Sequence, residues 1–183
     1  MIEVKINGLF LTQSQASGVI LKEIHGERTL PIIIGEYEAQ SIALGLENIK
    51  PPRPITHDLT LRIIESLGGQ IERVIVTDLR NNTYYAIIQI RRKMKLYEID
   101  ARPSDAIALA VRQNIPIYVE EEVMRKGAYT PDEMQELDET PIDLKQNRLE
   151  QLKKELQEAV EKEEYERAAK IRDEIKKLES RQS

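Results

Sequence analysis

Residues 97–123 read YEIDARPSDAIALAVRQNIPIYVEEEV, and this stretch carries the clearest indication of the fold. Its first residues alternate between polar and apolar side chains, as in a strand, and the run AIALAV that follows Pro103 is typical of a buried helix. The short apolar stretch IPIYV then predicts a second strand. We therefore expect a strand, a helix and a strand in succession, with parallel pairing of the two strands favoured although the crossover is short.

The residues before this stretch predict further strands and two helices. Asn81–Asn82 predicts a tight hairpin, because Asn tolerates a positive φ. Apolar residues at helical spacing indicate two helices, and Leu59, Ile63, Ile64 and Leu67 share one face of the second. The predicted strands cover residues 1–12, 17–24, 27–34, 70–80, 83–92 and 95–100, and the predicted helices cover residues 35–49 and 56–69. The fold class that follows is α+β, with a mixed or antiparallel sheet and packed helices.

The composition excludes several kinds of chemistry. The 183 residues contain no Cys, so the chain has no disulfide, no thiolate nucleophile and no Cys-based zinc site. Only two His residues, His25 and His57, are present, which excludes hydrolytic sites that need more. The first residues do not resemble a signal peptide, and no stretch approaches the roughly 20 apolar residues that span a bilayer. We expect a cytoplasmic protein without membrane contact.

The net charge of −5 arises in the C-terminal part of the chain. Residues 1–130 contain 16 basic and 16 acidic side chains, whereas residues 131–183 contain 11 basic and 16 acidic ones. A nucleic-acid-binding protein usually carries a basic excess, so binding here would depend on a local patch. The densest basic run is RRKMK, residues 91–95, in which Arg91 and Arg92 are candidate phosphate contacts. The alternative for this run is an ordinary solvated turn.

The corner before the apolar helix contains residue types that phosphodiester hydrolysis could use. Glu98 and Asp100 lie on one face of the predicted strand, where two carboxylates can hold Mg²⁺ or Mn²⁺. Arg102 and the first helical turn at Ser104 can bind a phosphate. Asp105 is, with Asp100, a candidate catalytic carboxylate. These types together offer a metal site, charge neutralisation and phosphate positioning.

Two further groups extend this candidate site. His57 lies in the first turn of the second helix, next to Asp58, and is a candidate general base with Asp58 as its orienter. Glu36 and Glu38 follow the strand that ends in IIIG and are further candidate metal ligands. Each group has a structural alternative, since a His at a helix start can be a surface or cap residue and acidic residues there are favoured by the helix dipole.

A purely structural interpretation of the corner is also open. Ser104 or Asp105 can bind free amides at the helix start, and Arg102 can simply pair with Asp100 or Asp105. The arrangement in space distinguishes the two interpretations. An active site is favoured if the carboxylates and Arg102 face one groove, whereas a buried Arg102 locked onto Asp105 argues against it.

The C-terminal part of the chain predicts a linker and a separate helical hairpin. Residues 129–144 are polar and contain two Pro, as linkers do. The helical pattern of apolar residues that begins at Leu149 ends near Glu163, and a new pattern with a different phase begins at Tyr165. This change predicts two antiparallel helices over residues 145–180. Such short helices bury little surface alone, so we expect them to dock on a partner chain, a second copy or the main domain, residues 1–128.

At this point the motifs resemble a known family. The stretch LPIIIGEYEAQSIALGL, residues 30–46, and the ungapped run DARPSDAI, residues 100–107, are similar to the bifunctional nuclease family, and the resemblance covers residues 1 to about 128. It implies an α+β domain that dimerises, carries a groove and cleaves both DNA and RNA. It implies no catalytic residue by itself, so the candidate roles above rest on residue chemistry.

The tail resembles a UVR motif, the helical hairpin shared by excision-repair subunits and some chaperone regulators. The matching pattern is Glu164-Tyr165-Glu166, then Ala168-Ala169 and Arg172-Asp173, with Tyr165 at a place where Phe is common. The resemblance implies a protein partner. The candidate partner contacts are Tyr165, Ala168, Ala169 and Arg172.

The sequence therefore leads to a leading interpretation and two alternatives. The leading one is a metal-assisted nuclease of low specificity that hydrolyses DNA and RNA, acts as a homodimer and binds a protein through its hairpin. The first alternative is a non-catalytic dimeric adaptor that recruits a repair or protease-regulator partner. The second is a small-molecule sensor with its site at the Asp100–Asp105 corner.

Overall fold

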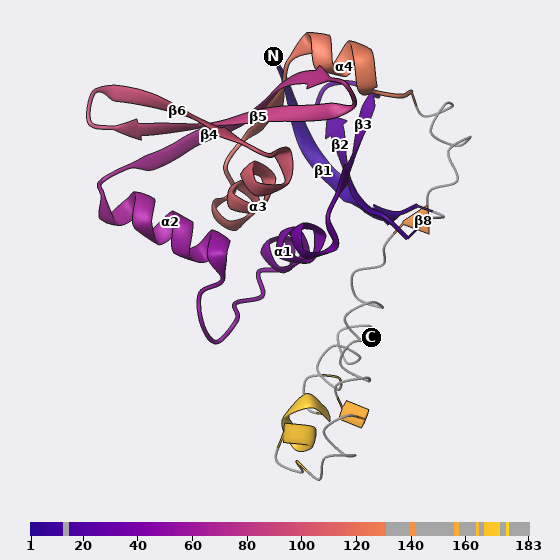
Figure 1. The fold of residues 1–183 in the computed structure, drawn as a ribbon, viewed down its shortest axis with the longest axis vertical. Helices are drawn as coiled ribbons and strands as arrows, with labels where there is room; N and C mark the ends of the chain where they lie inside the picture. The colour runs from indigo at the N-terminus through magenta and orange to yellow at the C-terminus, as the bar shows by residue number, and fades with distance from the viewer. Residues whose placement is uncertain are drawn as a thin grey trace. The chain divides into compact units, whose positions relative to one another are not determined.

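The computed structural model describes residues 1–12, 15–130, 140–141, 156–157, 164, 167–172 and 175. The chain divides into two compact units, Met1–Pro141 and Ile142–Ser183. The described residues of the first unit form the sheet and four helices, which are labelled in Figure 1. Its elements are β1 (Ile2–Leu11), β2 (Ser17–Glu23), β3 (Thr29–Ile34), α1 (Glu36–Leu46), α2 (Thr56–Ser66), β4 (Gln70–Arg80), β5 (Thr83–Arg92), β6 (Lys95–Ala101), α3 (Pro103–Gln113), β7 (Ile117–Val119), α4 (Glu121–Gly127) and β8 (Thr140–Pro141).

The strands form one mixed sheet, which confirms the predicted α+β class. The order is β3-β2-β1-β7-β4-β5-β6, and the two-residue β8 pairs with β1. The sheet bends, so that β1 to β3 run across the direction of β4 to β6 in Figure 1. The predicted hairpin between β4 and β5 is confirmed, since Asn81 and Asn82 both have positive φ, 50° and 59°.

The strand after α3 is placed differently from the simplest expectation. β7 pairs with β4 in parallel and with β1 in antiparallel register, and it does not pair with β6. β6 and β7 do run in the same direction, because β4, β5 and β6 alternate. The predicted strand–helix–strand unit therefore exists, but β4 and β5 lie between its two strands. In this way β7 joins the N-terminal meander to the rest of the sheet.

Helix α3 is the central buried helix. Pro103 occupies its first turn, where the missing N–H is not needed, and Asn114 ends it in the left-handed conformation at φ 53°. It packs against α1, α2, β4 and β5. The buried residues of α3 are Pro103, Ser104, Ala106, Ile107, Ala108, Leu109 and Ala110. The small Ala side chains leave room for the neighbouring elements to pack closely against α3.

Helix α2 contributes less to the core than its apolar residues suggest. Leu61 is buried at 7% exposure and is the only α2 residue in that class among those described. Leu59, Ile63 and Leu67, which share the face that the helical spacing indicated, are 51%, 50% and 62% exposed. One turn apart, these three side chains form an apolar stripe on the surface. We call it the α2 stripe.

The second unit is described only in part. Ala168, Ile171 and Ile175 are buried together, and Leu156 packs against them. Their spacing is helical, as the second apolar pattern of the tail predicted. The turn of the predicted hairpin and most of its first helix lie outside the described residues. Within the part of the chain that is described, no helix has the length and apolar character that crossing a bilayer requires.

Candidate active site

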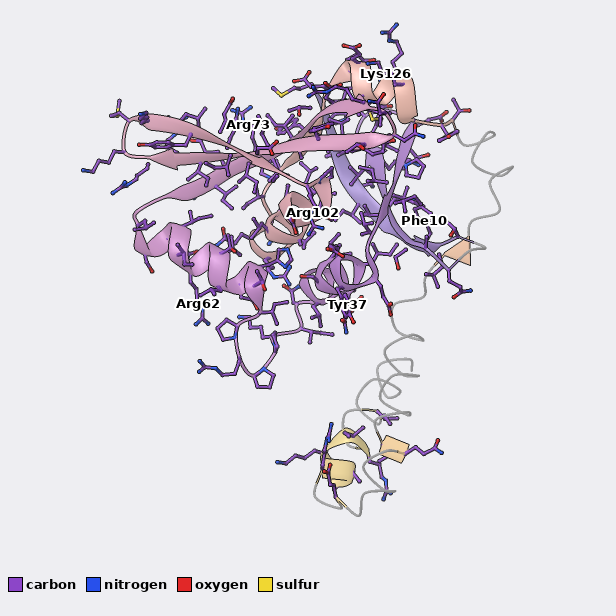
Figure 2. All side chains as sticks on the ribbon, viewed as in Figure 1. Phe10, Tyr37, Arg62, Arg73, Arg102 and Lys126 are labelled. Atoms are coloured by element: carbon purple, nitrogen blue, oxygen red, sulfur yellow. The ribbon has the colours of Figure 1, made fainter. Side chains whose placement is uncertain are left out.

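Charged and polar side chains of three helices meet where α1, α2 and α3 approach one another. The sequence brings them there because α1 and α3 pack side by side and α2 begins beside both. Figure 2 shows Arg102 at the start of α3, with Tyr37 of α1 nearby in the same part of the unit. We call this group the junction cluster. Its members are Glu38, Ser41, His57, Asp58, Arg102, Asp105 and Arg112.

Arg102 connects two carboxylates across the junction. Its Nε and Nη2 donate to Asp105 Oδ2 and Oδ1 at 2.7 and 3.0 Å, and Nη2 also lies 2.9 Å from Glu38 Oε1. The hydrogen bonds and charge of Asp105, followed by those of Glu38, raise the pKa of the guanidinium above the ordinary value for Arg. The side chain is nevertheless 65% exposed. Arg102 is thus locked onto Asp105 but not buried, so one face of the guanidinium stays open to solvent.

His57 is held from both sides of its ring. Nδ1 lies 2.8 Å from Ser41 Oγ, and Nε2 lies 3.4 Å from Asp105 Oδ1. Arg112 Nη2 donates to the same Ser41 oxygen at 3.0 Å. One proton arrangement satisfies all three bonds: Arg112 donates to Ser41, Ser41 donates to Nδ1, and Nε2–H donates to Asp105. The contact to Asp105 is the long one, so Nε2 is the ring nitrogen that can change partner most easily.

Arg112 anchors the inner end of the cluster. Its side chain is 9% exposed, and its Nε donates to Asp58 Oδ1 at 2.9 Å. Asp58 in turn accepts a 3.1 Å bond from the backbone N–H of Ile55 at the start of α2. Asp58 therefore orients α2 against α3. Within the described part of the chain, the hydrogen bonds of the His57 ring go to Ser41 and Asp105 and not to Asp58, its predicted orienter. Neither Ser41 nor Arg112 is recognisable in the sequence, because their roles depend on the packing of α1 against α3.

The carboxyl of Asp105 stays ionised over the physiological range. Its partial burial alone would raise the pKa, but the hydrogen bonds and charges of Arg102 and His57 outweigh that effect, and the pKa lies below its ordinary value. A carboxylate of this kind is a weak proton acceptor. Its position suits an orienting or electrostatic role beside His57 better than proton transfer.

The four predicted metal ligands do not form one common site. Glu98 and Asp100 are exposed on β6 and share the face of Gln89 and Ile87 in the β5–β6 register; Glu98 accepts a 2.8 Å bond from Gln89 Nε2. Glu36 is exposed in the first turn of α1. Glu38, the remaining candidate, already pairs with Arg102. Among the described residues, no three His, Asp or Glu side chains are close enough to hold a metal ion.

The other predicted residues fall at different places. Ser104 is 5% exposed, so its side chain lies inside the fold. Arg91 forms a bidentate ion pair with Glu72, whose pKa is lowered by that hydrogen bond. Arg92 is exposed at the end of β5.

The residues expected to bind a protein partner lie in the second unit. Ala168 is 4% exposed and belongs to the small buried cluster of that unit. Ala169 and Arg172 are exposed. Tyr165 lies outside the described residues.

Comparison with known proteins agrees with the motifs. A model of the bifunctional nuclease domain matches residues 19–132, and a model of the UvrB/uvrC motif matches residues 146–181. The chain belongs to the bifunctional nuclease domain family. All members of the junction cluster lie within the matched bifunctional nuclease domain. This order of a bifunctional nuclease domain and a UVR motif is the one that the sequence predicted.

The relatives fall into two groups. An uncharacterized protein of Mycobacterium tuberculosis is 44% identical over 138 residues, which is 74% of this chain and 82% of that protein. Bifunctional nuclease 1 of Oryza sativa subsp. indica is 30% identical over 105 residues, and bifunctional nuclease 2 of Arabidopsis thaliana is 30% identical over 107 residues. These matches cover 55% and 56% of this chain but only 32% of each plant protein.

Proposed function

We propose that this member of the bifunctional nuclease family is a cytoplasmic, metal-assisted nuclease of low sequence specificity that hydrolyses phosphodiester bonds in DNA and RNA. The observation that carries the proposal is the family match over residues 19–132, the unit that contains the junction cluster. The relatives named bifunctional nucleases in rice and Arabidopsis support it at 30% identity.

In this proposal the junction cluster binds one phosphate and moves one proton. The open face of Arg102 contacts a non-bridging phosphate oxygen and neutralises charge in the transition state. His57 Nε2 exchanges its long contact with Asp105 for a water molecule, and the ring takes the tautomer in which Nδ1–H donates to Ser41 Oγ, so that the free lone pair of Nε2 accepts the proton of that water. Asp105 keeps Arg102 in place, and Ser41 Oγ accepts the hydrogen bond of Nδ1–H and so holds the ring.

The proposal includes a divalent metal ion because the exposed carboxylates of β6 are of the kind that binds one. Mg²⁺ is usually held by one or two carboxylates and completes its coordination with water and substrate phosphates. Glu98 and Asp100 fit that partial mode, because both are exposed on one face of β6. They would hold Mg²⁺ or Mn²⁺, which supplies charge neutralisation when bound. Glu36 and Glu38 are further carboxylates of the proposal, although Glu38 would have to release Arg102.

The test is a cleavage assay on single-stranded DNA and RNA, with Mg²⁺, with Mn²⁺ and with EDTA. We expect metal-dependent cleavage that falls roughly 100-fold or more in His57→Asn and in Arg102→Gln. Asp100→Asn tests the metal position in the same way. Arg125→Gln on α4 is the matched control, because Arg125 is an exposed Arg outside the cluster and should keep full activity. Equal activity in all well-folded variants would contradict the proposed site.

A second candidate function is favoured by the internal pairing of the cluster. Arg102 pairs with Asp105 and Glu38, and Arg112 pairs with Asp58, as they would in a purely structural junction. On that basis we also propose a non-catalytic adaptor, in which the main unit is a scaffold and the UVR motif recruits a repair or protease-regulator protein. The exposed Ala169 and Arg172 would then face the partner. Absence of cleavage by the folded wild-type protein under every metal condition would favour this candidate.

We further propose that the chain forms a homodimer through the α2 stripe. An antiparallel pair of α2 helices around a two-fold axis near Ile63 would place Leu59 of one copy beside Leu67 of the other, and Arg62 near Glu65 of its partner. The wild-type mass by light scattering should be twice the chain mass of 21.1 kDa, and Ile63→Glu should give the single-chain mass. An unchanged mass in Ile63→Glu would exclude this interface.

A further inference from the structure

The turn between β5 and β6 places an apolar side chain at the outer end of a two-stranded ribbon. β5 ends at Arg92 and β6 begins at Lys95, and these two residues are cross-strand partners. Between them, Lys93 adopts a positive φ of 54°, which closes the turn tightly. Met94 is 96% exposed, more than any other large apolar side chain in the described part of the chain. None of the described residues of its unit covers Met94.

The ribbon is two strands wide at this end. β4 starts at Gln70, which pairs with Arg91, so the last pair of the ribbon extends past the neighbouring strand. Among the described strands, β6 is the edge of the sheet and pairs with β5 alone. Figure 1 shows the β5–β6 turn as the outermost point of that side of the sheet. Only the Arg92–Lys95 pair and the turn project past β4, and proteins that bind DNA through β-ribbons place such strands in the major or the minor groove.

The cations of the ribbon end surround Met94. A hollow beside the turn is lined by Arg92, Lys93, Met94, Lys95 and Tyr97. Among the described residues, no carboxylate forms an ion pair with Arg92 or Lys93, and Lys95 Nζ lies 4.9 Å from the centre of the Tyr97 ring. These three charges are therefore available to an external anion. Arg91, one residue further from the turn, differs because it is bound to Glu72.

We propose that Met94 is a wedge that enters between base pairs of a duplex, while Arg92, Lys93 and Lys95 contact the flanking phosphates. The inference rests on the proposed function in taking nucleic acid as the substrate, and it names the substrate class as double-stranded. Met is one of the residues that open a base step from the minor groove, and its flexible side chain adapts to any sequence. Phosphate contacts add affinity without sequence preference, in keeping with low specificity.

A duplex suits this surface better than an anionic membrane does. A single Met side chain buries too little apolar area to hold a protein at a bilayer, where even a longer acyl chain gives marginal binding. In a duplex the same side chain needs only to separate one base step. Arg92 on β5 and Lys95 on β6 also place a cation on each strand of the ribbon, so that phosphates on both sides of Met94 can be contacted.

The test uses the full chain in EDTA with a short duplex that carries 2-aminopurine, whose fluorescence rises when its stacking is lost. Wild type should bind the duplex and increase the fluorescence. Met94→Ser should abolish the increase and weaken binding roughly tenfold, and Met94→Leu should restore both. Ile33→Ser on the opposite edge strand, where Ile33 is 57% exposed, is the matched control and should behave as wild type. Arg92→Gln with Lys93→Gln should lower the salt dependence of log K by about 2.

Three results would overturn the wedge. They are an unchanged fluorescence response in Met94→Ser, an equal loss of affinity for a single-stranded oligonucleotide, and a Met94-dependent binding to anionic lipid vesicles without any effect on the duplex. The proposed nuclease can fail separately, because binding and fluorescence are measured without metal. Cleavage of single strands that persists in Met94→Ser, with no duplex response in wild type, would remove the wedge and leave the nuclease.

Discussion

At the scale of single residues, the junction cluster depends on shared partners. Ser41 Oγ contacts both His57 and Arg112, and Asp105 contacts both His57 and Arg102. A change at one of these positions therefore leaves two others with an unmatched donor or acceptor. This coupling makes the cluster testable by stability as well as by activity.

Arg112→Met should lower the free energy of unfolding by about 3 kcal/mol. The Arg112 side chain is 9% exposed and joins Asp58 of α2 to Ser41 of α1, so its removal leaves Asp58 Oδ1 and Ser41 Oγ without this donor in a partly buried place. Urea unfolding followed by circular dichroism measures the change. Arg125→Met on the surface of α4 should stay within about 0.5 kcal/mol of wild type. A loss for Arg112→Met as small as that of the control would show that the inner pairs are not stabilising.

Asp105 should make the folded state sensitive to acid. The pKa of its carboxyl is lower in the folded state than in an unfolded chain, so its stabilisation is present at neutral pH and is lost as the pH falls below about 4. At pH 7, Asp105→Asn should cost about 1 kcal/mol, and the difference from wild type should shrink between pH 4 and pH 2. Unfolding curves across that range measure this. Ile33→Ser, which removes no titratable group, should differ from wild type by the same amount at every pH.

At the scale of elements, close contacts between neighbouring strands limit substitution. Gly18 of β2 pairs with Phe10 of β1, and the ring of Phe10 is fully buried. A Cβ at position 18 would lie 2.2 Å from Phe10 Cζ. The ring fills the space that a side chain on β2 would otherwise occupy, so the pair fixes which residues these two strands can carry.

Gly18→Ala should destabilise the unit by about 2 kcal/mol, because the ring must move out of a packed core. Phe10→Leu should also destabilise it, since it removes buried atoms. The double variant should cost less than the sum of the two, because Leu leaves room for the new methyl group. Thermal unfolding of all four proteins gives the coupling energy. Simple additivity would mean that the strands separate to accept the methyl group.

Local chemistry made some elements predictable and left others open. The Asn81–Asn82 turn and the start of α3 at Pro103 follow from the backbone preferences of those residues. The place of β7 could not be predicted, because strand order depends on pairing between residues about 115 positions apart, such as Ile2 with Val119. The candidate site was predictable in its Arg102, Asp105 and His57, which sit at helix starts. Ser41 and Arg112 were not, since ordinary mid-helix positions become polar contacts only once the helices pack.

At the scale of the whole unit, β7 is the only described strand that contacts both halves of the sheet. It has three residues, Ile117–Val119, and pairs with β1 on one side and β4 on the other. Its two outer side chains are buried, with Val119 at 0% exposure. The sheet on either side is built from hairpins and a meander that pair locally. The unity of the fold therefore depends on a short central segment.

Val119→Ala should weaken both halves together. The lost packing should lower the free energy of unfolding by about 2 kcal/mol. Hydrogen exchange of the backbone amides should accelerate in both β1 and β4, by a similar factor in the two strands. Ile33→Ala on the edge strand β3 serves as the control, where any change should stay in β3 and its neighbour. Acceleration in only one half for Val119→Ala would show that the halves open independently.

The position of β7 also bears on how the chain is made. The meander of β1 to β3 and the antiparallel set of β4 to β6 can each pair as soon as their own residues leave the ribosome, since their partners are close in sequence. The strand that unites them arrives at residues 117–119, after both sets are complete. Until then, the β1 and β4 edges are exposed in the same nascent chain. During synthesis, both half-sheets would thus form before β7 is available to join them. At this stage the nascent chain would be most exposed to misassembly and to chaperone binding.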